Sequence, residues 1–269
     1  MITLEQLQDG IVIPIDKPRQ WSSFQAVNKV KSIIRNTFGL KKFKIGHAGT
    51  LDPLATGLLL VCIGKATKRI NELQDGIKVY TGTMVLGATT PCFDLERGID
   101  RYYPYQHIKS ELIEEKRHLF IGSIEQVPPM FSAVKVDGQR AYEYARLDNP
   151  EVTIEPKRVT ITDFQITNFR EGSDNVVPSP TTTSAHPTGQ ALHLYNNPQG
   201  EVPAHLPQID FRVQCSKGTY IRSLARDFGA ALGSGAFLSA LRREEIGEYK
   251  VTDALQLDEV SAFLQGVTA

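Results

Sequence analysis

The chain has 269 residues, of which 41% are hydrophobic, and this is enough apolar material for one large domain or two modest ones. Lysine and arginine number 30 and are balanced by 30 aspartate and glutamate residues, so overall charge does not indicate a nucleic-acid partner. The cysteines Cys62, Cys92 and Cys215 are far apart and form no CxxC pair, which excludes a disulfide framework and a cysteine-based metal site. No apolar run approaches the roughly 18–20 residues of a membrane span, and the N-terminus lacks the pattern of a secretory signal. These absences favour a reduced, cytoplasmic protein.

A helix and a buried strand are predicted in the first part of the chain. The chain bends at Pro18, and Ser22 or Ser23 can cap the helix that follows. Valine and isoleucine recur at helical spacing through residues 27–34. After a glycine-rich loop, the apolar run GLLLVCIG (57–64) lies between two glycines and predicts a buried strand.

The rest of the chain mixes helices and strands without a regular βαβ rhythm, which favours an α+β fold. The helices are predicted at 66–75 (closed by Gly76), 105–121 and 218–233. The strands are predicted at 78–90, 158–170 and 208–216. Residues 171–208 contain six prolines and no lysine or arginine, which predicts a flexible hairpin insertion.

Charge is distributed unevenly along the chain. Between Lys17 and Leu51 there are eight lysines and arginines and no aspartate or glutamate. A local basic field attracts a phosphate backbone whatever the net charge of the protein. On charge alone, the same residues also suit the solvated face of a helix, so both interpretations stay open.

The loop GHAGTLDPLATG (46–57) places one carboxylate just before the buried strand. Pro53 restricts Asp52 to an extended backbone conformation. The glycines at positions 46, 49 and 57 let other backbone or a ligand approach closely. Taken alone, Asp-Pro is typical of a turn.

The loop is also part of a longer pattern. The segment GHAGTLDPLATGLLLVCIGKATK (46–68) closely resembles the signature of the tRNA pseudouridine synthase B family, enzymes that modify the T loop of tRNA. Four further segments resemble motifs of that family and occur in the family's order: IDKPRQWSSF (15–24), KVYTGTMVLGATT (78–90), VPPMFSAVKVDGQRAYEYAR (127–146), and CSKGTYIRSLARDFGAALG followed by LRR (215–243). On these five motifs the chain is identified as a member of the family. Gln20 departs from the first motif, which usually has glycine there.

The resemblance implies the pseudouridine synthase fold. This is an α+β fold with a central mixed, mainly antiparallel sheet flanked by helices and a thumb-like insertion, here expected at 104–157. The catalytic domain is expected over 1–252, with the Pro-rich hairpin insertion at 171–208 and a short tail at 253–269. Family members often carry a C-terminal RNA-binding domain of the PUA type, which is not expected in this chain.

The resemblance also implies the reaction, in which uridine-55 of the T loop becomes pseudouridine. The N-glycosidic bond breaks, the base turns over and it rejoins the sugar through carbon, with no cofactor and no metal. Asp52 is the expected catalytic carboxylate, and three routes stay open: attack on C1′, addition to C6 of uracil, or removal of a ribose proton. Arg222 is expected to keep Asp52 ionised. Tyr80 is expected to stack on the uracil, with its hydroxyl near the proton that leaves C5.

The expected partner is the T arm of tRNA, bound by a monomer without a membrane. By resemblance, His47 inserts into the folded T loop, Lys68 supports the site and Leu241 lines the base pocket. The remaining expected RNA-binding residues are Lys17, Lys44, Lys135 and Lys217. Segments 17–44 and 127–157 are expected to hold the arm while the target base flips out of its stack.

Two other functions are also compatible with the sequence. The first is a guide-RNA-dependent synthase that modifies ribosomal RNA. The second is an RNA-binding protein that helps tRNA to fold, with catalysis secondary. The presence of Asp52, Tyr80 and Arg222 together favours catalysis.

Overall fold

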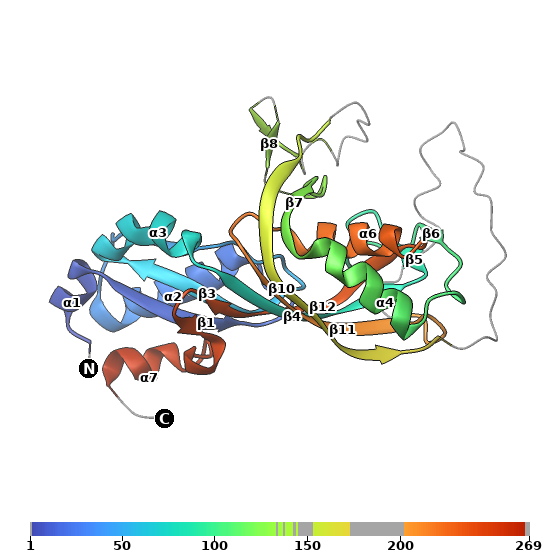
Figure 1. The fold of residues 1–269 in the computed structure, drawn as a ribbon. Coiled ribbons are helices and arrows are strands. Elements are labelled where there is room, and N and C mark those ends of the chain that lie inside the picture. The colour runs from blue at the N-terminus through green and yellow to red at the C-terminus, as the bar shows by residue number, and fades with distance from the viewer. Residues whose placement is uncertain are drawn as a thin grey trace. The chain divides into compact units, whose positions relative to one another are not determined.

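The computed structural model describes residues 2–132, 134–136, 138–141, 144, 153–172 and 202–266. The chain forms two compact units (Figure 1). Unit 1 comprises Met1–Thr81 and Leu241–Ala269, and unit 2 comprises Gly82–Ala240. Two strands, β4 (Lys78–Leu86) and β12 (Ala236–Ile246), contribute residues to both units.

In unit 1 the hydrogen-bonded strand order is β1-β3-β12-β4, with β2 and β13 as additional partners. The strands not yet introduced are β1 (Ile11–Lys17), β2 (Ile45–Ala48), β3 (Thr56–Ile63) and β13 (Tyr249–Lys250). β1 runs antiparallel to β3 along its whole length. On its other edge, β3 pairs in antiparallel fashion with β2 near its end and in parallel with β12 near its start. β3 is therefore the central strand of this unit.

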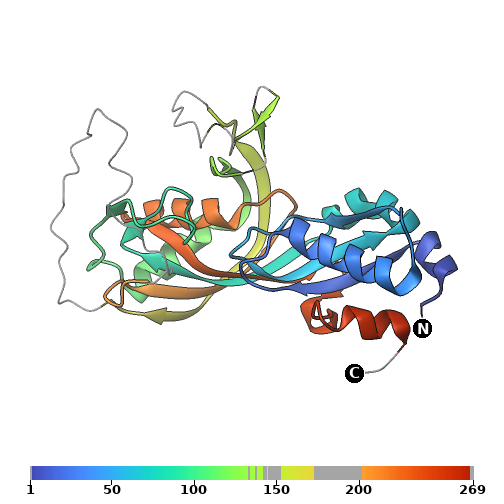
Figure 2. The ribbon, with the colours of Figure 1, turned by 180° about the vertical axis from the view of Figure 1, so that it is seen from behind.

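Helices cover both faces of the unit 1 strands, and Figure 2 shows α2 in front of them. The helices are α1 (Leu4–Asp9), α2 (Ser23–Phe38), the 3₁₀ helix η1 (Gly64–Arg69), α3 (Ile70–Asp75), the 3₁₀ helix η4 (Val251–Asp253) and α7 (Val260–Gln265). Leu59, Val61 and Ile63 pack with α2 and α7. The alternate residues Leu58, Leu60 and Cys62 pack with η1 and α3 on the opposite face. Burial on both faces explains why β3 is apolar at every position from Leu58 to Ile63 instead of alternating.

The predicted start of α2 is confirmed. The side chain of Ser22 accepts a hydrogen bond from the backbone N–H of Gln25, and the side chain of Gln25 accepts one from the backbone N–H of Ser22. This capping box satisfies two of the donors that a helix start leaves without intrahelical partners. The helix ends at Gly39, which adopts the left-handed conformation.

In unit 2 the strand order is β12-β4-β11-β10-β7. The sheet contains antiparallel pairs, such as β10 with β11, and the parallel pair β3 with β12, so the predicted α+β class with a mixed sheet is confirmed. The longer strands are β7 (Gly122–Gln126), β10 (Lys157–Arg170) and β11 (Gln208–Cys215). The short strand pairs are β5 (Ala88–Thr89) with β6 (Arg101–Tyr102), and β8 (Lys135–Val136) with β9 (Gln139–Arg140). The helices are α4 (Ser110–Arg117), the 3₁₀ helix η2 (His118–Phe120) and α6 (Ile221–Ala231).

Aromatic side chains join α6 to the strands of unit 2. The ring of Phe228 on α6 packs edge-to-face against Phe164 of β10 and Phe120 of η2, with centroids 5.4 and 5.5 Å apart. Phe164 in turn packs edge-to-face against Phe211 of β11. This geometry is the one that aromatic quadrupoles favour. The apolar stripe predicted for the 218–233 helix is therefore the face that holds α6 on the sheet.

The helix predicted at 105–121 is shorter than expected, because α4 covers only Ser110–Arg117. Ile108 is buried in the turn before the helix, and Leu119 in η2 is 64% exposed. The apolar residues that suggested one long helix thus belong to three different local structures. The helix predicted at 66–75 is likewise divided, into η1 and α3.

Several expected segments fall partly or wholly outside the described residues. Most of the 171–208 insertion lies there, as do parts of the expected thumb at 104–157. Of the tail expected at 253–269, Val260 and Leu264 pack into the core of unit 1. The expected domain boundaries stay predictions. None of the helices that the structure describes combines the length and hydropathy needed to cross a membrane.

Candidate active site

The loop that carries Asp52 lies between β2 and β3 in unit 1, and α2 fixes its backbone. The hydroxyl of Ser23 accepts a hydrogen bond from the backbone N–H of Leu51 at 2.8 Å and donates one to the carbonyl of Leu51 at 3.1 Å. The backbone N–H of Gln20 donates to the carbonyl of Pro53 at 2.8 Å. The residues on both sides of Asp52 are therefore held, which agrees with the stiff loop expected from the Asp-Pro sequence.

Gln20 adopts a left-handed backbone conformation, with φ of 67°. This conformation is costly for residues other than glycine. It explains physically why glycine suits the position where this chain has Gln20.

Lys17 is the buried cation beneath this loop, and its side chain is 0% exposed. Its ammonium donates to the carbonyls of Trp21 at 2.6 Å, Pro18 at 3.0 Å and Pro53 at 3.4 Å. Burial lowers the pKa of Lys17 from 10.5 to about 8, with Asp52 opposing and Arg243 adding to the decrease. An ammonium enclosed by three carbonyls is directed at the loop and not at a surface phosphate. In this structure Lys17 holds the loop, and the expected contact of Lys17 with RNA stays a prediction.

Arg243 on β12 is a second buried cation, and the sequence did not single it out. Its Nε donates to the carbonyl of Leu58 at 2.8 Å, and one Nη donates to the carbonyl of Gly49 at 2.9 Å. A Cβ at Gly49 would lie 3.3 Å from the other Nη, and a Cβ at Gly57 would overlap the backbone of Arg243. Arg243 thus joins the two ends of the Asp52 loop, and it requires glycine at both contacts.

His47 is half-buried at the end of β2. Burial, and to a smaller extent the positive charge of Arg243, lowers the pKa of its imidazole below 6.5, so the ring is neutral at pH 7. Its Nδ1 is buried and makes no hydrogen bond to any residue that the structure describes. A neutral ring in the segment that leads to Asp52 suits contact with a nucleic-acid base.

Tyr80 and Leu241 lie on neighbouring strands of unit 1, while Lys44 and Lys68 lie elsewhere in the unit. Tyr80 is a buried residue of β4, and Leu241 is a half-buried residue of β12. Lys44 precedes β2 and Lys68 lies in η1, and the backbone N–H of Gly64 donates to the carbonyl of Lys44. Lys44 therefore lies beside the Ile63 end of β3, and the expected support of the site by Lys68 stays a prediction.

Arg222 is the second residue of α6 in unit 2, and it is buried. Its Nη atoms donate to the carbonyls of Cys92 at 3.2 Å and Phe131 at 2.9 Å. Its Nε lies 3.7 Å from the carboxylate of Asp94, and both side chains are less than 10% exposed. Asp94 in turn accepts a hydrogen bond from the backbone N–H of Glu96. A buried guanidinium with a carboxylate partner is a rigid cation. The Asp52–Arg222 pairing joins residues of different units and stays a prediction.

The remaining predicted residues belong to unit 2. Lys217 lies exposed in the turn before α6. Lys135 belongs to β8, and its side chain is outside the described part of the structure.

Burial and the neighbouring Asp94 raise the pKa of Cys92 to about 12, so its thiol stays protonated and is not a nucleophile.

Sequence reasoning missed Arg243 and Ser23 as contacts of the Asp52 loop in unit 1, and Asp94 as a partner of Arg222 in unit 2. Arg243 stands in the LRR motif, but a motif does not reveal that the side chain turns inward. Asp94 lies between two family motifs, and neither spacing nor periodicity marks it. Among the described residues, no group of three or more His, Cys, Asp or Glu side chains could hold a metal ion.

The chain is similar to known proteins over nearly its whole length. Residues 35–179 match the model of the TruB family pseudouridylate synthase N-terminal domain. The tRNA pseudouridine synthase B of Flavobacterium johnsoniae is 49% identical over 265 residues, which are 98% of this chain and 100% of that protein. The proteins of the same name from Phocaeicola vulgatus and Thermobifida fusca are 44% and 40% identical over 96% and 95% of this chain, and over 94% and 75% of their own lengths.

Solved structures share the fold. A Cbf5–Nop10–Gar1 complex contains a chain that is 25% identical with a TM-score of 0.61, and an archaeal box H/ACA sRNP Nop10–Cbf5 complex contains one that is 22% identical with a TM-score of 0.57. The matches cover 98% and 96% of this chain, which spans 58% and 55% of the respective Cbf5-complex chains. From the family match and the near-complete relatives, the chain belongs to the TruB family of pseudouridylate synthases.

Proposed function

We propose that the protein isomerises the T-loop uridine of tRNA, uridine-55, to pseudouridine. The observation that carries the proposal is the similarity to proteins named tRNA pseudouridine synthase B over nearly the whole of both chains. The rigid loop around Asp52 supports it, because a catalytic group must be held in its productive geometry. We place this activity in the cytoplasm and assign it to a monomer.

The reaction is an isomerisation, so its atoms balance within the nucleoside. The C1′–N1 bond breaks, a C1′–C5 bond forms, the proton on C5 leaves and N1 gains one. Asp52 starts the reaction by attacking C1′, by adding to C6 of uracil or by taking a ribose proton. Arg222 holds Asp52 in its ionised form, and Asp94 positions Arg222. Tyr80 stacks on the uracil and lies near the proton that leaves C5.

The target uridine reaches this site by base flipping. Unstacking a base costs a few kcal/mol, which contacts in the pocket and to the phosphates must offset. His47 takes the place of the extruded base, and its neutral ring at pH 7 suits a stacking role. Leu241 lines the base pocket, and Lys44, Lys135 and Lys217 contact phosphates.

The test uses an unmodified tRNA transcript and the purified full-length protein. Pseudouridine is mapped by chemical adduct formation and primer extension for wild type, for Asp52→Asn, and for Asp258→Asn as the matched control on an exposed aspartate. We expect one modified uridine, at position 55, for wild type and control. Asp52→Asn keeps the charge-independent contacts, so tRNA binding persists while the product disappears.

Other outcomes favour other functions. Modification by Asp52→Asn at the wild-type rate removes Asp52 from its role. Modification that begins only when a guide RNA is added favours a guide-dependent synthase. Accelerated refolding of tRNA by wild type without any pseudouridine favours a folding protein.

A further inference from the structure

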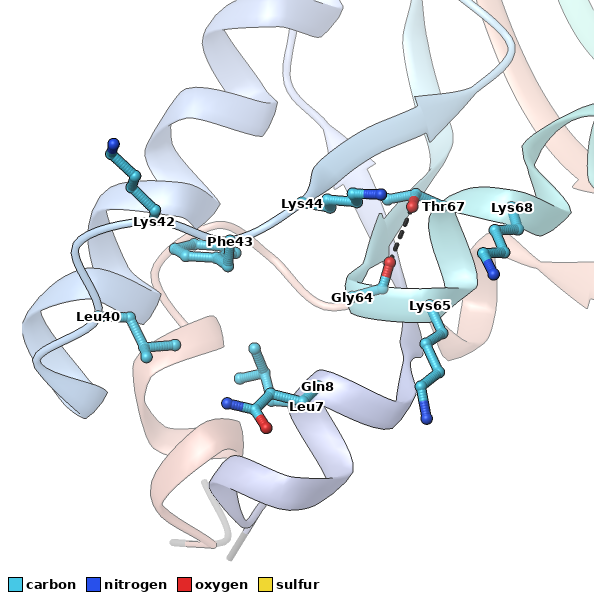
Figure 3. Close-up of a pocket in the computed structure, with 10 residues that line it drawn as sticks. All are labelled: Leu7, Gln8, Leu40, Lys42, Phe43, Lys44, Gly64, Lys65, Thr67 and Lys68. Carbon is cyan, nitrogen blue, oxygen red and sulfur yellow. Dashed lines mark hydrogen bonds between the residues drawn. The ribbon is translucent and has the colours of Figure 1, made fainter.

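A basic pocket lies in unit 1, apart from the candidate active site (Figure 3). Its volume is about 360 Å³, and it is formed by the end of α1, the segment before β2 and the 3₁₀ helix η1. Antiparallel pairing of β2 with β3 sets these elements at the Ile63 end of β3, whereas Asp52 precedes the Thr56 end. With eight residues in β3, the two ends are about 25 Å apart. The pocket is therefore not part of the Asp52 loop.

The rim of the pocket is cationic. Lys42 and Lys44 extend from the segment before β2, and Lys65 and Lys68 extend from η1 (Figure 3). All four side chains are exposed, and no acidic side chain lines the pocket. Asp9, which does not line the pocket, pairs with Lys65 at 2.6 Å on the surface. The rim thus keeps a clear excess of positive charge, which attracts an anion.

The floor of the pocket is apolar and fixed. Leu7 is buried, and Leu40 and Phe43 are half-buried against the core that also holds α2. α1 and η1 approach so closely that a Cβ at Gly64 would overlap the carbonyl oxygen of Leu7. The hydroxyl of Thr67 donates to the carbonyl of Gly64 at 2.8 Å, which closes the first turn of η1. A rigid apolar floor with an aromatic ring suits a flat, partly apolar group such as a nucleobase.

We propose that this pocket binds one unstacked nucleotide of the RNA substrate, other than the target uridine. The base lies on Leu40 and Phe43, and the flanking phosphates contact the lysines of the rim. RNA fits better than a free mononucleotide, because four separate ammonium groups exceed what one phosphate can engage. It fits better than an acidic peptide, because the floor offers stacking that carboxylates do not use. The identity of the RNA rests on the proposed function.

The first test removes charge from the rim. Lys42→Gln/Lys65→Gln takes one lysine from each side of the pocket. Lys109→Gln/Lys250→Gln is the control, because it removes two exposed lysines that neither line the pocket nor lie in the segments expected to hold the T arm. Fluorescence anisotropy of labelled tRNA gives the binding constant at several salt concentrations. Each lost phosphate contact reduces the slope of log K against log salt by about 1. The slope should therefore be smaller by about 2 for the pocket variant, which should bind tRNA about tenfold more weakly than wild type in 0.1 M salt. The control should change by clearly less.

The second test addresses the floor without relying on a variant's stability. Ultraviolet cross-linking of wild-type protein to tRNA, followed by mass spectrometry, should place an RNA adduct at Phe43. Phe43→Leu keeps an apolar side chain but removes the ring, and it should weaken tRNA binding by about fivefold or more. An adduct that never includes residues 40–44 overturns the proposal.

Further outcomes separate the occupants. One outcome assigns the pocket to a free nucleotide and overturns the proposal. In it, calorimetry shows that wild type binds uridine monophosphate, Lys42→Gln/Lys65→Gln abolishes this binding, and that variant binds tRNA as tightly as the control variant does. Displacement of tRNA by polyglutamate from wild type, but not from the pocket variant, assigns it to an acidic peptide. If wild type makes pseudouridine and both double variants bind tRNA alike, this inference fails and the proposed function stands. If wild type makes none, the proposed function fails, and the salt slopes still report on the pocket.

Discussion

Replacing Lys17 with methionine should change how the stability of the protein depends on pH. Burial lowers the pKa of Lys17 from 10.5 to about 8 in the folded protein. Since each pKa unit is worth about 1.4 kcal/mol, keeping this ammonium charged at pH 7 costs the folded state about 3 kcal/mol. Below pH 8 both the folded and the unfolded chain hold the proton, so the cost is complete. Between pH 8 and 10.5 the unfolded chain binds more protons, and stability therefore rises with pH.

The measurement is urea unfolding of wild type and Lys17→Met at pH 7 and pH 10. Methionine fills a similar volume but cannot titrate, so the difference between the two proteins isolates this one group from all other ionisations. We expect the free energy of unfolding of wild type, relative to the variant, to increase by about 2–3 kcal/mol from pH 7 to pH 10. Lys250→Met, which removes an exposed lysine of the same unit, corrects for the loss of one positive charge.

The absolute effect of Lys17→Met at pH 7 combines two opposing contributions. The variant escapes the cost of the buried charge, but it leaves the carbonyls of Pro18, Trp21 and Pro53 without their donor, and each unsatisfied group costs about 1–3 kcal/mol. The pH dependence is free of this ambiguity. A relative stability that is the same at pH 7 and pH 10 would refute the argument that burial depresses this pKa.

Two further predictions concern the backbone beside Asp52 and the partner of Arg222. Gly57→Ala places a Cβ on the backbone of Arg243 at a φ of +100°, so the free energy of unfolding in urea should fall by about 3 kcal/mol. Gly39→Ala is also at positive φ but has open space around it, so its free energy of unfolding should fall by only about 1 kcal/mol. Equal decreases would contradict the role of the close approach between Gly57 and Arg243. Asp94→Asn removes the carboxylate beside buried Arg222 and should lower kcat for pseudouridine formation by about 10- to 100-fold, with little change in KM. The control Asp227→Asn breaks a more exposed pair with Arg226 and should leave kcat unchanged. An unaltered kcat in Asp94→Asn would show that Asp94 does not position Arg222.

Local signals in the sequence were sufficient for much of the fold. The cap at Ser22 and the glycines that bound 57–64 act on neighbouring residues, so α2 and β3 could be predicted without knowledge of the tertiary structure. The long helix at 105–121 could not. Ile108 and Leu119 repeat at helical intervals, but Ile108 is buried in the turn before α4 and Leu119 lies exposed after it. Periodicity cannot distinguish these cases, because tertiary packing decides them.

The candidate site was predicted unevenly for a similar reason. Asp52, Tyr80 and Arg222 came from motifs, which record residue types in sequence order. The inward direction of Lys17 and Arg243 depends on carbonyls at Pro53, Leu58 and other positions. A lysine in a basic stretch is normally a surface residue, so charge alone assigned Lys17 to RNA. Only the packed structure shows that its ammonium donates to carbonyls of Trp21 and Pro53.

The central position of β3 limits the amino-acid substitutions that unit 1 can accept during evolution. Each side chain from Leu58 to Ile63 fills one of two separate apolar layers, so neither layer can be repacked without moving the strand. A strand displaced in this way carries the loop with it, because Gly57 abuts the backbone of Arg243. Mutational tolerance should therefore be low along a stretch that touches no substrate, and neutral drift in unit 1 is expected to concentrate on its outer helices.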